Sequence, residues 1–192
     1  WSFDGPDMGT TSAIDRSGNN NTGWLINGPV RKIGRIGQAL EFDGVDDKVI
    51  PPDSSSLKIT AAITISAWIE LNVNQASMDA LAAIFRRWGG IGGGYFFGFS
   101  GSGNPDIQFS TADGVSQDSE IVTFTFKPRQ WYHVVGVWSP NPGNKAIYID
   151  GVVYSPSASS NSSIANAPFD APGLGGNFND TNNSFNGLID DV

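Results

Sequence analysis

The chain has 192 residues, of which 39% are hydrophobic, 11% aromatic and 16% charged, a composition typical of a globular domain rather than a disordered or coiled-coil chain. Its formal net charge of −8 argues against a nucleic-acid partner, because non-specific binders need a basic surface to neutralise phosphates. The absence of cysteine excludes disulfides and thiol chemistry. No apolar run reaches the roughly 20 residues of a membrane helix, so no membrane insertion is expected.

Short stretches in which apolar and polar residues alternate predict β-strands along the whole chain. In chain order they are residues 39–42, 63–69, 121–126, 131–138 and 146–149. Turn signals lie between them, and Asp150-Gly151, between Ile149 and Val152, predicts the clearest hairpin. The pattern predicts an all-β fold.

Two segments allow more than one interpretation. Residues 76–85 have a weak helical period, which competes with a strand over 81–85, and we interpret them as a loop followed by a strand. Residues 155–172 are rich in Ser, Asn, Ala and Pro. Because strand signals follow them, they indicate a long loop within one domain rather than a linker.

A family resemblance rests on six segments in a fixed order. They are Asp15-Arg16-Ser17-Gly18-Asn19 with Gly23 following, and residues 36–47, 63–69, 131–137, 147–151 and 185–192. Together they resemble the laminin-G-like jelly roll of the concanavalin A-like lectin and glucanase superfamily. The resemblance implies a two-sheet antiparallel β-sandwich, with residues 1–192 as one domain.

The resemblance also implies a setting for this domain. Such domains are modules of secreted or cell-surface proteins, here of a bacterium, and are monomeric modules covalently linked to other domains. In that family the last motif continues beyond Asp190-Asp191-Val192. We therefore expect the chain to be excised from a longer multidomain protein.

Glycoside hydrolysis needs two carboxyl groups facing each other across the scissile bond. The glucanases of this superfamily supply them from a Glu-x-Asp-x-x-Glu strand. This sequence has three glutamates, and none lies in that pattern: Glu41, Glu70 and Glu120. Most aspartates fall in turns such as Asp43-Gly44, where capping of the backbone is the simpler role. The sequence therefore predicts no enzyme activity.

A lyase would need a Tyr or His base beside a cation. His133, with Tyr132 and Arg129, is the cluster that offers these residue types. Strand alternation places His133 on the same face as Trp131 and opposite Val134, which favours a hydrogen-bonded strand residue over a base. A polysaccharide lyase or glycoside hydrolase with an unrecognised site remains the weakest alternative.

The Asp-, Asn- and Gly-rich loops suit calcium, which takes six to eight oxygen ligands. The resemblance implies one structural calcium ion, held by Asp190 of the closing strand, the Gly44 carbonyl, Asp15 and Asn20. The alternative is that Asp15 and Asn20 form side-chain turns and that Asp190 caps a strand end.

Aromatic residues are the natural platforms for sugar rings. Trp68, Trp131, Phe42 and Phe126 lie within alternating strands, so we assign them to the core. Trp88 instead stands in a glycine-rich segment.

Two arginines, Arg86 and Arg87, precede Trp88 directly. Guanidinium groups beside an indole suit an acidic sugar, and these three residues predict a ligand site for an acidic polysaccharide. The alternative is that one arginine pairs with a nearby aspartate while Trp88 covers the edge of the core.

Two further pairs complete the predicted ligand site. Tyr95 and Phe97 share one face of a strand, which is either core or binding surface, and Phe178 and Asn179 lie in a polar loop. The sequence thus predicts a non-catalytic carbohydrate-binding module for a polysaccharide or oligosaccharide, appended to a secreted polysaccharide-degrading enzyme. The main alternative is an extracellular adhesion or protein-interaction domain.

Overall fold

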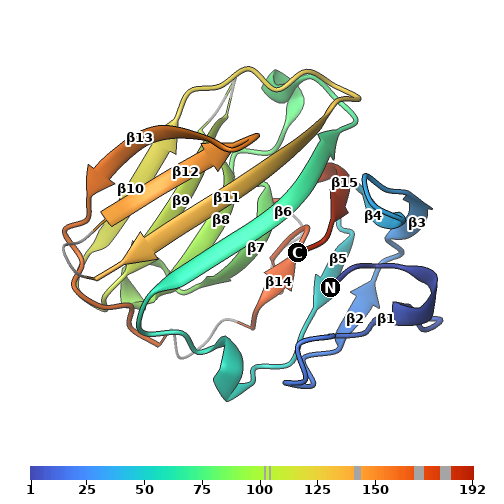
Figure 1. The fold of residues 1–192 in the computed structure, drawn as a ribbon, viewed down its shortest axis with the longest axis horizontal. Coiled ribbons are helices and arrows are strands. Elements are labelled where there is room, and N and C mark those ends of the chain that lie inside the picture. The colour runs from blue at the N-terminus through green and yellow to red at the C-terminus, as the bar shows by residue number, and fades with distance from the viewer. Residues whose placement is uncertain (102, 104, 141–143, 167–170, 178–182) are drawn as a thin grey trace.

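Two antiparallel sheets pack face to face in the computed structural model, which describes residues 1–101, 103, 105–140, 144–166, 171–177 and 183–192 (Figure 1). In spatial order the first sheet contains eight strands: β1 (Ser12–Ala13), β2 (Gly23–Ile26), β5 (Lys48–Ile50), β14 (Gly173–Leu174), β7 (Ala83–Trp88), β8 (Gly94–Ser100), β9 (Asp106–Ala112) and β10 (Gln117–Val122). The predicted all-β sandwich is confirmed.

The second sheet contains seven strands and lies in front of the first in Figure 1. In spatial order they are β13 (Val152–Ala158), β12 (Asn144–Ile149), β11 (Trp131–Ser139), β6 (Ile63–Leu71), β15 (Asn186–Asp190), β4 (Gln38–Asp43) and β3 (Val30–Ile33). The helices are single 3-10 turns: η1 (Gly5–Asp7), η2 (Ser55–Leu57), η3 (Gln75–Ser77) and η4 (Gly90–Gly92). Within the described ranges no helix is long and apolar enough to cross a bilayer.

The core lies between the sheets and is rich in aromatic rings. Phe97 of β8 and Phe109 of β9 meet edge to face, with ring centroids 5.7 Å apart. Gly136 of β11 faces these rings from the other sheet, and a Cβ there would lie 2.8 Å from the Phe109 ring. Glycine at this position lets the two sheets approach across the phenylalanine pair.

Most of the predicted strands are observed, but two boundaries are wrong. The loop predicted at 155–172 begins later, because β13 continues to Ala158. The strand predicted at 121–126 is β10, which begins at Gln117 and ends at Val122. The chain leaves the sheet there because the Phe126 amide donates to the Gln75 side chain, at 2.9 Å, and not to a neighbouring strand. The Asp150-Gly151 hairpin is confirmed, with Ile149 paired to Val152.

The core assignment of Trp68 and Trp131 is wrong. In β6 the apolar residues on either side of Trp68 point inward, so Trp68 points outward and is only half-buried. The Arg35 guanidinium carbon lies 4.9 Å from the Trp68 ring centroid, and the His133 ring lies 5.0 Å from it. Trp131 is also half-buried on the outer face of the seven-stranded sheet.

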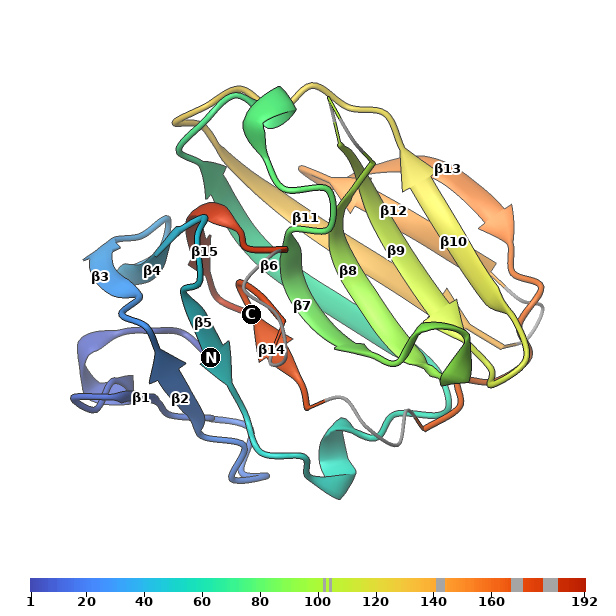
Figure 2. The ribbon, with the colours of Figure 1, turned by 180° about the vertical axis from the view of Figure 1, so that it is seen from behind.

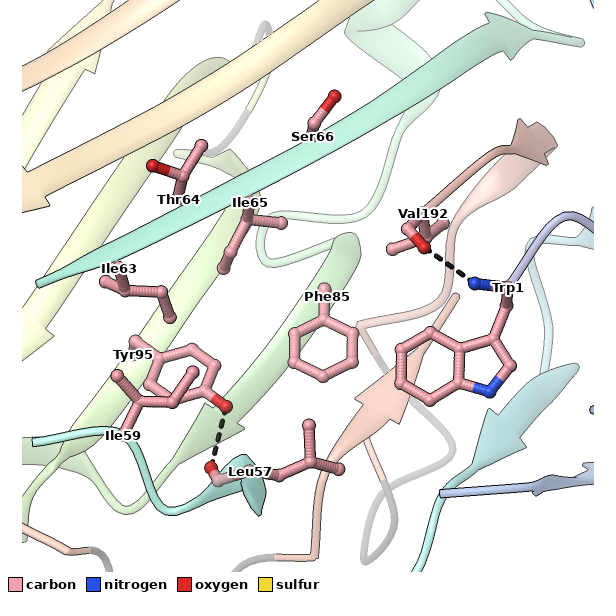
Figure 3. Close-up of a pocket in the computed structure, with 10 residues that line it drawn as sticks. All are labelled: Trp1, Leu57, Ile59, Ile63, Thr64, Ile65, Ser66, Phe85, Tyr95 and Val192. Carbon is pink, nitrogen blue, oxygen red and sulfur yellow. Dashed lines mark hydrogen bonds between the residues drawn. The ribbon is translucent and has the colours of Figure 1, made fainter. Parts of the chain in front are cut away.

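The first and last residues of the chain lie side by side. The Trp1 backbone nitrogen donates to the Val192 carbonyl at 2.7 Å, as Figure 3 shows, and the Val192 amide donates to the Trp1 carbonyl at 3.1 Å. The Trp1 ring stacks on Phe85, 5.9 Å between centroids, at the open side of the sandwich.

Candidate functional site

Strands β7 and β8 divide the predicted ligand residues between two faces of the sheet. Their register pairs Arg86 with Phe96 and Arg87 with Tyr95. Residues directly opposite each other in an antiparallel pair share a face, and successive residues alternate. Arg86, Trp88 and Phe96 therefore lie on the outer face, while Arg87 and Tyr95 point into the sandwich.

Arg87 is not available to a ligand. It is 2% exposed, and its Nη2 lies 3.0 Å from Asp53 Oδ1. Asp53 also pairs with Lys58 at 2.9 Å. One of the two arginines thus pairs with a nearby aspartate, as the alternative interpretation predicted. The prediction of Arg87 as a ligand residue is wrong.

Tyr95 and Phe97 belong to the core. They are 1% and 0% exposed. The Tyr95 ring stacks on Phe85 at 6.0 Å, and its hydroxyl donates to the Leu57 carbonyl at 2.8 Å, as Figure 3 shows. Because both rings are enclosed by apolar side chains, neither can stack on a sugar at the surface, and their assignment to the ligand site is wrong.

A pocket of about 160 Å³ lies on the outer face of strands β7 to β10 of the eight-stranded sheet. These strands lie nearer the viewer in Figure 2. We call this pocket the outer-face pocket, and it is lined by Leu81, Arg86, Trp88, Phe96, Gln108, Ser110 and Gln117. Gly94 and Ala112 lie between Trp88 and Gln117 in one cross-strand row. These small residues leave space between the indole and the amide.

The polar side of the pocket is a linked array of amides and hydroxyls. Ser119 Oγ accepts from Gln108 Nε2 at 3.1 Å and from Gln117 Nε2 at 3.0 Å, and lies 2.8 Å from Ser110 Oγ. On the other side, Arg86 Nη2 donates to the Trp88 carbonyl at 3.3 Å. Aromatic rings, a cation and hydrogen-bonding groups thus meet in one pocket.

Sequence reasoning found Arg86 and Trp88 of this pocket but missed the others. Strand alternation could have identified Phe96. If Tyr95 and Phe97 belong to the core, Phe96 between them must point to the outer face. Gln108 and Ser110 likewise alternate with buried Ile107 and Phe109. Phe178 and Asn179 lie outside the described residues.

The predicted metal ligands do not surround one point. Gly44 and Asp190 lie near opposite ends of β15, since Asp43 pairs with Asn186 and Leu40 pairs with Ile189. At about 3.3 Å per residue, the four residues from Asn186 to Asp190 span about 13 Å. One ion cannot contact both, so the prediction of a shared site is wrong.

Asp15 forms a side-chain turn. Its Oδ1 accepts from the Ser17 amide at 2.7 Å, and its Oδ2 accepts from the Ser17 hydroxyl at 2.8 Å and the Asn21 amide at 2.9 Å. Asn20 has a φ of 58° in this turn. The Asp15 side chain therefore stabilises a turn of the backbone, as the alternative to a calcium ligand predicted.

Asp15→Ala is expected to lower the free energy of unfolding by about 1 kcal/mol, the typical net contribution of such hydrogen bonds. Urea unfolding with and without calcium checks this. The stabilisation by calcium should equal that of the wild type, and a calcium response lost with Asp15 would place a ligand here.

Asp190 lies in a site suited to a cation. It is fully buried, its Oδ2 accepts from the Ile36 amide at 3.0 Å, and its Oδ1 has no hydrogen-bond partner among the described residues. Burial raises the Asp190 pKa to about 6. The buried Gln38 Oε1 also lacks a partner in the described part of the chain, and the Gln38 amide donates to Asp4 Oδ1 at 2.9 Å.

The 34–38 loop therefore contacts two carboxylates, Asp4 and Asp190. Unsatisfied buried oxygens from a carboxylate and an amide are ligands that calcium takes readily. The Asp190 carboxylate fits such an ion, but the Gln38 side chain does not lie beside it. Gln38 shares a face of the sheet with Leu40 and Ile189, whereas Asp190 lies on the opposite face with Leu188.

A second acidic cluster can also hold a metal. One carboxylate oxygen from each of Asp43, Asp46 and Asp47 lies within 4.8 Å of the others. Asp47 is 5% exposed, and burial raises its pKa. Gly44 belongs to this turn, where Asp43 Oδ1 accepts from the Val45 amide at 2.8 Å.

Comparison with known proteins agrees with this architecture. The family model described as the concanavalin A-like lectin/glucanases superfamily (Laminin_G_3) matches residues 43–192. The chain belongs to this superfamily. The resemblance drawn from the sequence motifs is thereby confirmed. No curated protein sequence matches the chain.

Two solved structures illustrate the superfamily fold. Domain 4 of AbnA, an extracellular arabinanase of family GH43 from Geobacillus stearothermophilus, in complex with arabinotriose, has a TM-score of 0.71 at 19% identity, covering 99% of this chain and 87% of that one. The receptor-binding domain of botulinum neurotoxin mosaic serotype C/D has a TM-score of 0.59 at 15% identity, covering 93% and 44%. At these identities the likeness concerns the fold.

Proposed function

We propose that this superfamily member is a non-catalytic carbohydrate-binding module that binds a glycan in the outer-face pocket. One observation carries the proposal: two aromatic side chains, Trp88 and Phe96, line the same pocket as the polar array of Gln108, Ser110 and Gln117. A lectin-like fold and a similar domain solved with arabinotriose support it.

The chemistry of the pocket matches the two kinds of surface on a sugar. The C–H face of a ring stacks on Trp88, and its hydroxyls exchange hydrogen bonds with amides and hydroxyls such as Gln117 and Ser110. Arg86 lies on the same wall, where 6% of its surface is exposed, and a guanidinium favours a carboxylate or sulfate group, so we propose an acidic polysaccharide as the preferred ligand.

The positions of the glutamates support a binding role rather than hydrolysis. The described lining of the outer-face pocket contains no Asp or Glu. Glu41 and Glu70 line a groove on the other sheet, and Glu120 accepts a hydrogen bond from Ser157 between the sheets. The pair of opposed carboxyls needed for glycoside hydrolysis is thus not part of this lining.

We further propose that a calcium ion occupies the Asp190 site with a structural role. It would neutralise the buried Asp190 carboxylate, whose Oδ1 has no partner among the described residues, and would hold β15 next to the loop that contains Ile36. The extracellular arabinanase domain supports secretion and attachment to a polysaccharide-degrading enzyme.

Affinity electrophoresis tests the binding proposal. The protein is run through gels containing arabinan, xylan, β-glucan, alginate, carrageenan or polygalacturonate. At least one polymer, of the acidic group, should retard the wild type, and Trp88→Ala should weaken that retardation about tenfold, equivalent to about 1.4 kcal/mol.

Trp24→Ala is the matched control for Trp88→Ala. Trp24 is 58% exposed on β2, away from the pocket, so its removal should leave the retardation unchanged. Unaltered mobility of the wild type in every gel would contradict glycan binding and favour the protein-interaction alternative. Retardation by neutral polymers alone would contradict the acidic preference.

A further inference from the structure

A groove of about 480 Å³ crosses the outer face of the seven-stranded sheet, on the opposite side of the sandwich from the outer-face pocket. It is lined by Lys32, Ile33, Glu41, Glu70, Asn72, Arg129 and Leu188. The lining comes from β3, β4, β6 and β15 and from the segments that follow β6 and precede β11. Residues from distant parts of the chain thus build one concave surface that combines charged, amide and apolar side chains.

One row across four strands runs through the groove and ends at Trp131, which lies beside the lining residue Glu70 and is not itself part of the lining. Trp131 of β11 pairs with Glu70 of β6, Glu70 pairs with Leu188 of β15, and Leu188 pairs with Glu41 of β4. Residues opposite each other share a face, so all four side chains lie on the outer side. Neighbouring strands are about 4.8 Å apart, so the glutamate backbones lie about 10 Å apart, on either side of Leu188.

The two glutamates have different surroundings. Glu41 pairs with Lys32 at 3.2 Å and accepts from Asn72 Nδ2 at 3.0 Å. Glu70 is half-buried and makes no hydrogen bond or ion pair with the described residues. Burial raises the Glu70 pKa, an effect that the charge of Arg129 opposes. The Glu70 carboxylate therefore has acceptor capacity that these residues do not use.

Hydrogen-bond donors and an aromatic ring surround Glu70. The Arg129 amide donates to the Leu71 carbonyl at 2.8 Å, which holds this arginine at the groove with a φ of 58°. Asn72 supplies an amide, and the half-buried Trp131 indole stands beside Glu70 in the row. A partly exposed indole next to a carboxylate, a guanidinium and an amide can stack on one sugar face and bind its hydroxyls.

We infer that this groove is a second glycan site, with Trp131, beside its edge, as the stacking platform and Glu70 as the acceptor for sugar hydroxyls. Its ligand is a neutral oligosaccharide, because Lys32 and Arg129 balance the two glutamates of the lining, so the groove has no net charge that would attract a uronate or a sulfated sugar. The outer-face pocket, with Arg86, has the opposite preference. The inference is independent of the proposed function, since the two sites lie on different sheets.

Nuclear magnetic resonance titration of the six indole N–H signals tests the groove directly. The probes are arabinotriose, xylotetraose, cellotetraose and laminaritetraose, with trigalacturonate as the acidic counterpart. Trp131→Phe and Trp88→Phe assign the two relevant signals. We expect at least one neutral probe to shift the Trp131 signal saturably, and trigalacturonate to leave it in place.

Variants separate the groove from the pocket. Glu70→Gln should raise the dissociation constant measured at Trp131 at least fivefold, whereas Trp88→Ala and the control Trp24→Ala should not change it. A Trp131 signal that no neutral probe moves at about 10 mM, near the weak limit of specific binding, overturns the inference. An unchanged constant in Glu70→Gln, or a response that vanishes in Trp88→Ala, also overturns it.

The titration also distinguishes this inference from the proposed function. A response at Trp131 without any response at Trp88 would support the groove and contradict the outer-face pocket. Circular dichroism and thermal unfolding of Glu70→Gln provide the fold control. The groove assignment requires a native spectrum together with the weakened binding.

Discussion

Phe97→Ala is expected to lower the free energy of unfolding by about 3–5 kcal/mol while leaving the glycan affinity of the folded protein unchanged. The Phe97 ring is fully buried against Phe109, so its removal leaves a cavity between the sheets. Trp88→Ala should have the opposite profile, because Trp88 lines the outer-face pocket and is only partly buried. Urea unfolding measures the first effect, and affinity electrophoresis well below the unfolding midpoint measures the second.

Phe97→Leu is the conservative control, since it keeps most of the buried volume and should lose less stability than Phe97→Ala. The face assignment would be contradicted by a Phe97→Ala protein that is as stable as wild type and no longer binds glycan. It would also be contradicted by a Trp88→Ala protein that loses several kcal/mol of stability.

Calcium is expected to stabilise the protein by about 4 kcal/mol at a thousandfold excess over its dissociation constant, a rise in midpoint temperature of about 10 °C. Asp190→Asn should abolish most of this response, because the Asp190 carboxylate supplies the charged ligand at the site. Thermal unfolding in calcium and in chelator measures both. Asp46→Asn is the control, and loss of the response in that variant alone would place the ion in the Asp43, Asp46 and Asp47 cluster.

The pH dependence without metal follows from the same carboxyl. Burial raises the Asp190 pKa to about 6, from the ordinary aspartate value of 3.8. The protonated form is therefore favoured in the folded state. This group's contribution to stability is complete below about pH 4 and falls as the pH rises through 6, by about 3 kcal/mol for a shift of about two units. In chelator, Asp190→Asn should remove this decline.

The strands and hairpins were predictable because they depend on neighbouring residues. Alternation along β6 and β11, and the Asp150-Gly151 turn, are local patterns, and the structure has strands and a hairpin there. Which face of a strand becomes interior is not local. Trp68 was assigned to the core for its hydrophobicity, but it faces outward and is covered by Arg35, from a distant loop.

The metal and ligand sites were less predictable because they depend on contacts between residues that are distant in the sequence. Asp190 accepts a hydrogen bond from Ile36, 154 residues away, and Gln38 contacts Asp4 across the same loop. No sequence spacing indicates these contacts. The sequence shows that Phe96 lies on the opposite face of its strand from Tyr95 and Phe97. It does not show which of these two faces is the interior, so Phe96 could not be assigned to the surface.

The pairing of Trp1 with Val192 has a mechanical consequence. Because both ends leave the sandwich at one place, a load applied between them pulls across this backbone pair rather than along the strands. Hydrogen bonds loaded in this direction break one after another, so the two bonds between Trp1 and Val192 are the first to break. Rupture under tension is governed by the rate of unfolding. The contact between Trp1 and Val192 should therefore open at low force even where the equilibrium stability of the domain is high.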